Sequence, residues 1–190
     1  MATTQQSPAV INGVPVQDLL NTIEAVKKSP SIARFKFRIR NEWEGASKNR
    51  SHVASFHGAG KEQLRERPFH VEADEPPVLL GKDSAASPVE HLLHALASCL
   101  TTSMVYHAAA KGIQLQEVES ILEGDLDLQG FLELDRTVRP GCQGIRVKFN
   151  IKADAPDEQL QEIVQLGTGH SPVFDSLTRG VPVQVEVGRL

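Results

Sequence analysis

Residues 88–112 constrain the fold of this chain more than any other part of the sequence. Their leucines, alanines, methionine and valine do not collect on one narrow stripe but occupy most of the circumference of a helix. A helix that is apolar on all sides is normally buried in the interior of a protein. At about 1.5 Å per residue this helix is roughly 35 Å long, enough to cross a small domain. The sequence therefore predicts a buried central helix around which the other elements are arranged.

Both ends of this helix carry ordinary start and stop signals. Ser87 is a candidate N-cap, and Glu90 follows at the spacing of a capping box. Pro88 suits the first helical position, and Gly112 comes directly after the last turn. We therefore expect the helix to begin and end at these residues.

Cys99 lies midway along the predicted helix. At about 100° per residue its face is shared by Leu92, Ala95, Ser103 and Tyr106. The thiol would then look onto an apolar wall that carries two hydroxyl groups. Such surroundings are typical of a pocket.

Hydrophobic periodicity on either side of this helix predicts an α+β fold. Apolar residues at helical spacing predict helices at residues 14–28 and 157–166, with a further helical turn after Ser171. Alternation predicts strands at residues 33–44, 52–56, 69–73, 117–128, 130–138, 145–152 and 181–187. Turn-forming composition predicts loops at 45–50 and 78–87. The strand at 33–44 is expected to be half buried, because its large apolar residues alternate with four cations.

Composition and charge exclude several classes of protein. The length of 190 residues is that of one domain. The net charge of -4 disfavours a nucleic-acid partner, which requires a concentrated basic patch. There is no signal-peptide pattern at the N-terminus and no apolar run of about 18 residues, so no membrane association is expected. The two cysteines form no disulfide framework, which favours a cytoplasmic protein.

Cys99 is the strongest candidate for chemistry, although a buried helical cysteine is often an inert small hydrophobe. A reactive thiol must be ionised, and Cys99 is too far from the helix start to benefit from the helix dipole. A cation from elsewhere in the chain would therefore have to lower its pKa from the reference of about 8.5. Lys48, Arg50 and Arg179 are the candidates, and the residue pattern does not choose among them.

Two motifs resemble the family of osmotically inducible protein C (OsmC) and the organic hydroperoxide resistance proteins. They are SPVEHLLHALASCL, which begins at Ser87, and HSPVFDSLTRGVPVQVEV, which begins at His170. The likeness covers roughly residues 35–187, so that residues 1–30 are an N-terminal extension with a short helix and residues 31–190 an OsmC-like domain. The resemblance implies an intertwined homodimer, with two curved sheets around long central helices and a site shared between subunits.

The resemblance also implies a peroxidase site. In the family, the cysteine of the central helix attacks the peroxide, a second cysteine resolves the sulfenic acid, and an arginine with a glutamate holds the thiolate. Cys99 matches the attacking cysteine, and Arg50 is the best match for the arginine, with Lys48 as a competitor. Glu90 lies near the acidic position, but the closer alignment places Val89 there, and a capping box also accounts for Glu90.

The chain departs from this pattern at the resolving position. Ser171 stands ahead of Pro172 where the family has its second cysteine, and a hydroxyl cannot resolve a sulfenic acid. Ser171 is instead predicted to be the N-cap of a helix. Cys142 does not match the resolving position, and a bridge to Cys99 would need the two Cα atoms within about 7 Å. An external thiol reductant is therefore expected.

No metal ion and no cofactor are expected. His91, His94 and His107 lie on the same helix as Cys99 and could suggest a zinc-type site. Helical ligands must share a face, however, and Cys99 lies about 140° from His94.

Two functions from different classes remain open. The first is a thiol peroxidase that reduces organic hydroperoxides through Cys99 with an external thiol reductant. The second is a non-catalytic protein that binds a small hydrophobic or electrophilic ligand in an apolar pocket, with Cys99 as part of the lining. The sequence alone does not decide whether the chain is an enzyme.

Overall fold

The computed structural model describes residues 10–189. The chain falls into two compact units, which are described separately: residues 15–92 together with Val10, and residues 11–14 together with the chain from Leu93 onward. Residues 1–9 of the expected N-terminal extension lie outside the described residues.

The N-terminal segment contains two short strands, β1 (Val10–Ile11) and β2 (Val14–Pro15), followed by helix α1 (Val16–Lys28) and a 3₁₀ turn, η1 (Pro30–Ala33). The expected short helix is thus present. It carries Asp18 in its first turn and Lys27 and Lys28 in its last, the arrangement that complements the helix dipole.

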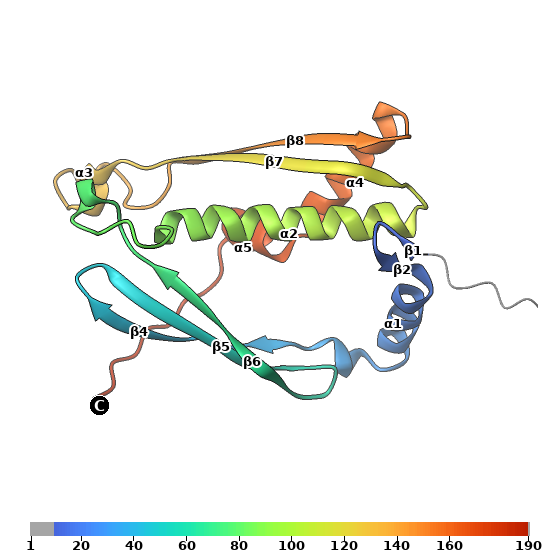
Figure 1. Cartoon of the computed structure of the whole chain (residues 1–190), viewed down its shortest axis with the longest axis horizontal. Helices are drawn as coiled ribbons and strands as arrows, with labels where there is room; N and C mark the ends of the chain where they lie inside the picture. The colour runs from blue at the N-terminus through green and yellow to red at the C-terminus, as the bar shows by residue number, and fades with distance from the viewer. Residues whose placement is uncertain (1–9, 190) are drawn as a thin grey trace, which may run out of the picture. The chain divides into compact units, whose positions relative to one another are not determined.

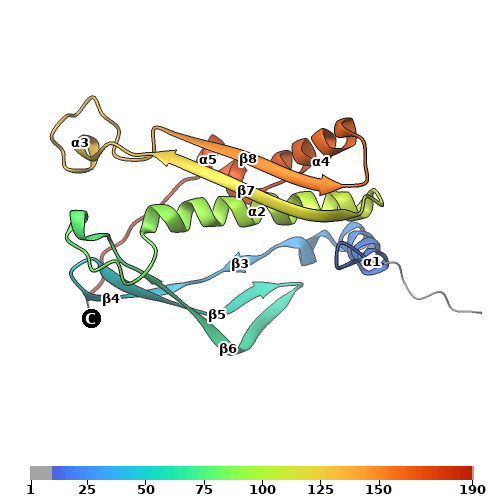
Figure 2. The same ribbon diagram turned by 45° about the horizontal axis from the view of Figure 1, so that its top comes forward.

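The first unit is built on an antiparallel sheet of β3 (Lys36–Phe37), β4 (Arg40–Gly45), β5 (Lys48–Gly58) and β6 (Lys61–Ala73), shown in Figures 1 and 2. Strand β5 lies at its centre and pairs with β3, β4 and β6. The loop expected at residues 45–50 is wrong from Lys48 onward, because the turn needs only Ala46 and Ser47 between the two strands. The hairpin of β5 and β6 is longer than the two short strands expected. Ala59 and Gly60 both have positive φ, as a tight two-residue hairpin turn requires, and the charged segment simply continues the pairing.

The strand expected at residues 33–44 is split into β3 and β4, and its apolar face is not half buried. Its four large apolar side chains are 52–76% exposed: Phe35, Phe37, Ile39 and Trp43. The alternating pattern indicates which side chains share a face, but it does not show whether that face is covered. The loop expected at residues 78–87 is present and begins at a 3₁₀ turn, η2 (Pro77–Leu79).

Helix α2 (Pro88–Ala110) covers the range predicted for a long apolar helix, and from Leu93 it belongs to the second unit. The antiparallel strands β7 (Leu115–Asp125) and β8 (Gly144–Ala153) follow, with the short helix α3 (Leu128–Phe131) between them. Helices α4 (Asp157–Gly169) and α5 (Pro172–Arg179) come after β8 (Figure 1). The core consists of Met104 and Ala108 from α2, Ile113, and Ile163 from α4, packed against the inner residues of β7 and β8.

Two expected strands of the second unit are wrong. Residues 130–138 form the end of α3 and a series of turns, because Asp127 caps α3 and Gly130 lies against the backbone of Arg139, where a Cβ would clash with the Arg139 carbonyl oxygen. Residues 181–187 form no strand in the part of the chain that the structure describes. A strand needs a partner edge as well as an alternating pattern, and the pattern alone does not supply one.

The helices at residues 157–166 and after Ser171 are confirmed, as is the strand at 145–152. Among the described residues, no helix is both long enough and apolar enough to cross a membrane.

Candidate functional site

Helix α2 presents Cys99 between two leucines that anchor the helix. Leu96 and Leu100 are 3% exposed and belong to a buried stripe that recurs every four residues through Met104 and Ala108. Cys99 lies beside this stripe and is a half-buried free thiol. The residues expected to share its face are also only partly covered, and Tyr106 is 50% exposed. The thiol is therefore held on a rigid element without being sealed in the core.

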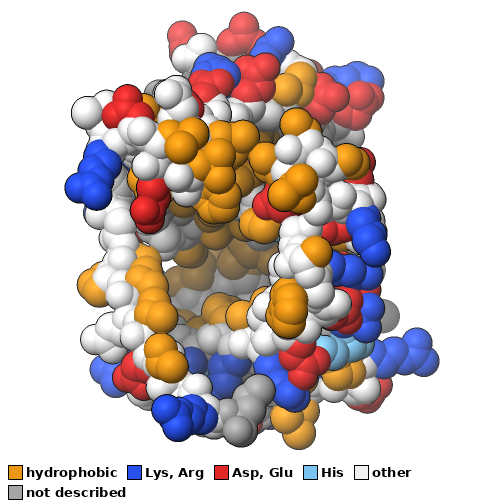
Figure 3. All heavy atoms as spheres, turned by 90° about the vertical axis from the view of Figure 1, so that its left-hand side faces the viewer, with side chains coloured by type: hydrophobic (Ala, Val, Ile, Leu, Met, Phe, Trp, Pro, Cys, Tyr) orange, Lys and Arg blue, Asp and Glu red, His pale blue; other side chains and the backbone are white. Residues whose placement is uncertain are grey.

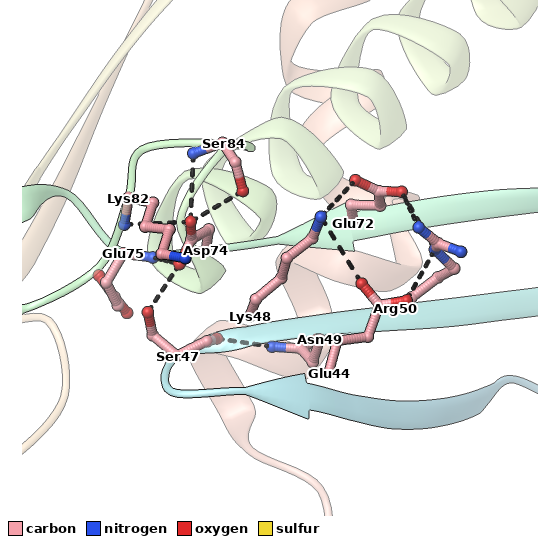
Figure 4. Close-up of polar contacts among 10 residues, drawn as sticks. All are labelled: Glu44, Ser47, Lys48, Asn49, Arg50, Glu72, Asp74, Glu75, Lys82 and Ser84. Atoms are coloured by element: carbon pink, nitrogen blue, oxygen red, sulfur yellow. Dashed lines mark hydrogen bonds and ion pairs between the residues drawn. The ribbon is translucent and has the colours of Figure 1, made fainter.

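A cluster of two cations and two carboxylates lies on β4, β5 and β6 (Figure 4). Arg50 donates from Nη2 and Nε to Glu72 Oε1, at 2.7 and 3.0 Å, and its Nε lies 3.3 Å from Glu44 Oε1. Lys48 Nζ lies 3.6 Å from a carboxylate oxygen of Glu44 and 3.6 Å from one of Glu72. The pKa of Glu72 lies below its ordinary value, because of the hydrogen bonds from Arg50 and the charges of Lys48 and Arg50. Lys48 and Arg50, two of the three cation candidates, thus share the same two acids.

Neither Glu44 nor Glu72 was predicted as a site residue. The register of the sheet places Arg50 between Glu42 and Glu72 as direct cross-strand neighbours, and Lys48 opposite Gly45. That register is fixed by the turns of two hairpins, and no local pattern in the sequence reveals it. The available signal was the alternation of charge along each strand, which indicates a charged face but not its partners.

His91 links this cluster to the first turns of α2. Its Nε2 donates to the backbone carbonyl oxygen of Glu72 at 2.8 Å. Among residues 10–189, no group of three or more histidine, cysteine, aspartate or glutamate side chains is arranged to hold a metal ion. His91 therefore acts as a hydrogen-bond donor that joins α2 to β6.

Glu90 forms the capping box expected at the start of α2. The backbone N–H of Ser87 donates to Glu90 Oε2 at 2.7 Å, and the backbone N–H of Glu90 donates to Ser87 Oγ at 3.3 Å. The pKa of Glu90 is lowered by its hydrogen bonds with Ser87. The carboxylates that contact Arg50 are those of Glu72 and Glu44, and a role for Glu90 in holding a thiolate stays a prediction.

Asp74 organises the loop that leads into α2 (Figure 4). It is 2% exposed and accepts hydrogen bonds from two serine hydroxyls, those of Ser47 at 2.6 Å and Ser84 at 2.8 Å. It also accepts from the backbone N–H groups of Glu75, Lys82 and Ser84 at 2.9–3.2 Å. These bonds hold the pKa of Asp74 well below its usual range. A buried carboxylate that accepts five hydrogen bonds was also missed by sequence reasoning.

Ser171 is the N-cap of α5, as predicted. It is 1% exposed, and its Oγ accepts the backbone N–H of Phe174 at 3.3 Å. Arg179, the third cation candidate, lies at the end of the same helix with its side chain 82% exposed and paired with Asp175 at 3.1 Å.

Cys142 is a free thiol beside the start of α2. A Cβ on Gly124 would lie 3.7 Å from Cys142 Sγ and 3.3 Å from a methyl group of Leu93, so these three residues are neighbours. Leu93 precedes Cys99 by roughly 9 Å along the helix axis and points about 120° away around it. Cys142 therefore lies beside a different part of α2 from the part that carries Cys99.

The structure brings Arg50, Lys48, Glu44 and Glu72 together and caps two helices with Glu90 and Ser171. Lys48 and Arg50 belong to the first unit and Cys99 to the second. The association of these cations with the thiol stays a prediction.

A family model described as OsmC-like protein matches residues 81–186, more than half of the chain. The chain belongs to the OsmC family. The family model does not extend upstream of residue 81. For the residues before it, the resemblance expected from the sequence is supported by the fold.

Solved structures support the same fold for the OsmC-like chain. An OsmC-like protein from Mycoplasma pneumoniae has a TM-score of 0.59 at 17% identity, over 77% of this chain and 89% of that one. A putative osmotic stress induced and detoxification response protein from Psychrobacter arcticus has a TM-score of 0.57 at 14% identity, over 75% and 88%. An organic hydroperoxide resistance protein OsmC from Legionella pneumophila has a TM-score of 0.51 at 15% identity, over 75% and 90%. No curated protein matches the sequence. At these identities the likeness establishes the α+β OsmC-like fold.

Proposed function

We propose that this OsmC-family chain is a thiol-dependent peroxidase that reduces organic hydroperoxides, with Cys99 as the attacking residue. The observation that carries the proposal is the half-buried free thiol midway along helix α2 of an OsmC-family chain. The name of the Legionella pneumophila protein with the same fold, an organic hydroperoxide resistance protein, supports the substrate class.

The proposed reaction has two halves. The Cys99 thiolate attacks one peroxide oxygen, the O–O bond breaks, and the other oxygen leaves as an alcohol after taking a proton, so that Cys99 becomes a sulfenic acid. One thiol of an external dithiol then displaces water from the sulfenic sulfur, and the second thiol releases Cys99 as the dithiol closes to a disulfide. Ser171 at the resolving position and Cys142 beside Leu93 both favour an external reductant. The reducing cytoplasm is the compartment in which we expect this cycle.

In this proposal Arg50, assisted by Lys48, lowers the pKa of the Cys99 thiol and stabilises the thiolate. The two hydrogen bonds to Glu72 fix the plane and direction of the Arg50 guanidinium, which leaves its remaining donors for a ligand. The acid that orients the arginine is then Glu72, and Glu90 serves the helix cap.

We also propose that the functional form is a homodimer that completes the site. Helix α2 is apolar around most of its circumference, yet among the described residues only its buried stripe and Ala109 are fully buried. The first sheet leaves Phe37 73% and Trp43 76% exposed. Hydrophobic side chains reach the surface at many points in Figure 3. Exposed apolar surface of this extent supports the proposal of an interface between chains.

The test of the peroxidase proposal is the stoichiometry of peroxide loss. Reduced wild-type protein is mixed with cumene hydroperoxide, first alone and then with dithiothreitol. We expect about one equivalent of peroxide to be consumed per Cys99 without dithiol, and continued turnover with it. Cys99→Ser should consume none, while the matched control Cys142→Ser should behave as the wild type. Equal peroxide loss in Cys99→Ser, or none in the wild type, would contradict the proposal.

A second candidate is a non-catalytic protein for a small hydrophobic or electrophilic ligand. It is favoured by the pairing of Lys48 and Arg50 with Glu44 and Glu72, which balances the cationic charge of the cluster. The rate of Cys99 alkylation by iodoacetamide against pH separates the two candidates. A binding protein should react at neutral pH no faster than a free cysteine, whereas a peroxidase should react faster and retain that rate below pH 7.

A further inference from the structure

Arg50 lies between two carboxylates that come from the two strands beside β5 (Figure 4). Its Nε donates to Glu72 Oε1 on β6 at 3.0 Å and lies 3.3 Å from Glu44 Oε1 on β4. Its Nη2 also donates to Glu72 Oε1, at 2.7 Å. A free arginine side chain has many rotamers, so a small displacement of either acid changes which one holds the guanidinium. The direction of the Arg50 guanidinium therefore depends on how firmly β6 holds Glu72.

Glu72 occupies a weak place in the sheet. It is the last residue but one of β6, which ends at Ala73. Among the described strands β6 pairs only with β5, so its other side is an open edge. Backbone groups on the open side of an edge strand have no partner within the sheet, and strand ends open more readily than strand centres. Pairing with β5 alone leaves the backbone of Glu72 poorly anchored.

His91 supplies a second anchor for this residue. Its Nε2 bonds the backbone carbonyl oxygen of Glu72 at 2.8 Å, and because a carbonyl oxygen only accepts, Nε2 carries the proton. The imidazole itself starts from a fixed point. The backbone N–H of His91 donates to the carbonyl oxygen of Ser87 at 3.0 Å, in the same turn of α2 that the capping box closes. Ser87, His91, Glu72 and Arg50 all belong to the first unit, so the path from the helix cap to the guanidinium is continuous.

We propose that His91 is a positioning residue for Arg50. By holding the backbone of Glu72, it keeps the Glu72 carboxylate in place for both guanidinium hydrogen bonds and so prevents Arg50 from turning to Glu44. The inference rests on the proposed function, in which Arg50 stabilises the Cys99 thiolate. It adds that the reactivity of this thiol depends on a histidine that acts only through Glu72.

The test uses two substitutions of His91 and a matched control. His91→Leu keeps a side chain of similar size but removes the donor. In His91→Gln the amide nitrogen extends to about the place of Nε2 and donates to the same carbonyl oxygen. His94 lies one turn further along α2 and is exposed, so His94→Leu is the control. Circular dichroism checks that all three variants are folded.

The first measurement is the nitrogen–proton NMR signal of the Arg50 Nε–H group, which does not involve Cys99. Glu72→Gln gives the position of this signal when the carboxylate is absent. We expect His91→Leu to move the signal towards that position and to speed its hydrogen exchange at least about threefold. His91→Gln and His94→Leu should keep the wild-type signal. An unchanged Arg50 signal in His91→Leu would overturn the inference, whatever the chemistry of Cys99.

The second measurement is the rate of Cys99 alkylation by iodoacetamide against pH. We expect His91→Leu to slow the reaction at pH 7 at least about threefold and to shift its profile to higher pH, and His91→Gln to restore both. In a Glu72→Gln background His91→Leu should have no further effect, because the two residues act in series. A variant that only melts earlier, with the wild-type profile, would show a structural role and overturn the inference. If wild-type Cys99 reacts like a free cysteine, the proposed function fails, and the Arg50 signal still decides whether His91 positions Arg50.

Discussion

Glu72 connects three parts of the first unit through a single residue. Its carboxylate binds Arg50 and faces Lys48, and its backbone carbonyl accepts the His91 side chain from the first turns of α2. The side chain therefore sets the direction of the two cations, while the backbone carbonyl bonds the first turns of α2 to β6. Glu72 thus joins the charged face of the sheet to the first turns of α2 within the first unit.

The first stability prediction concerns Asp74. We expect Asp74→Asn to lower the midpoint temperature of thermal unfolding by several degrees. Both carboxylate oxygens act only as acceptors, Oδ1 for Ser47 and Glu75 and Oδ2 for Lys82 and Ser84. An amide replaces one acceptor with a donor and leaves the groups facing it without a partner. Thermal unfolding followed by circular dichroism at pH 7 measures the change.

The matched control is Asp83→Asn in the same loop. Asp83 is exposed and has φ 54°, a conformation that asparagine also adopts readily. We expect its thermal midpoint to equal that of the wild type. If Asp74→Asn also melted with the wild type, the five hydrogen bonds would not be what stabilises the loop.

At the scale of elements, the contact of α4 with α2 depends on a glycine. A Cβ on Gly167 would lie 2.9 Å from the backbone nitrogen, Cα and Cβ of Met104, all of which belong to the rigid part of α2. Ile163 is completely buried in the same contact. The two helices pack closely because this position has no side chain.

Gly167→Ala is therefore expected to destabilise the fold by about 1–3 kcal/mol, since the helices must separate to admit a methyl group. Gly169→Ala in the same helix is the control, because a Cβ there meets nothing within 4 Å. The control should be neutral or slightly stabilising, as alanine is a better helix former than glycine. Urea unfolding of both variants measures the difference, and equal stabilities would show that α2 and α4 have room to adjust.

Elements with their own local signals were predictable from the sequence. Helix α2 has a capping box, a proline at its first position and a glycine after its end, and α5 has Ser171 as its cap. Strand β8 alternates cleanly. The long hairpin of β5 and β6 was predicted only in part, because its charged segment has no apolar alternation and its extent is set by the Ala59–Gly60 turn.

The residues of the candidate site also divide into those that a local sequence signal reveals and those that it does not. Cys99 stands out because it is a cysteine in a motif, and Glu90 and Ser171 because they are caps. Glu72 and Asp74 were missed because their partners come from other strands and from a loop, through a register that no local window contains. The strand expected at residues 181–187 was wrong because an alternating pattern does not by itself supply a partner edge.

At the scale of the whole molecule, several acids are held ionised by their partners. The pKa values of Glu62 and Glu72 are lowered by hydrogen bonds from Arg38 and Arg50, and that of Asp74 by hydroxyl and backbone donors. The pKa of His107 is lowered from its ordinary value of 6.5, by partial burial first and then by the nearby charges of His170 and Lys111. In every case the folded protein binds fewer protons than the unfolded chain.

Stability should consequently fall as the pH is lowered. The folded state loses stability wherever the unfolded chain binds more protons, so the first loss is expected just below pH 6.5, from His107, and a second below about pH 4.5, from the carboxylates. Urea unfolding at fixed protein concentration between pH 7.5 and pH 3.5 measures the profile, with the concentration held constant because dimerisation adds to apparent stability. His107→Gln should flatten only the upper step and Asp74→Asn only the lower one. Stability that stays constant or rises on acidification would mean that these partners do not hold the groups in their charge states in solution.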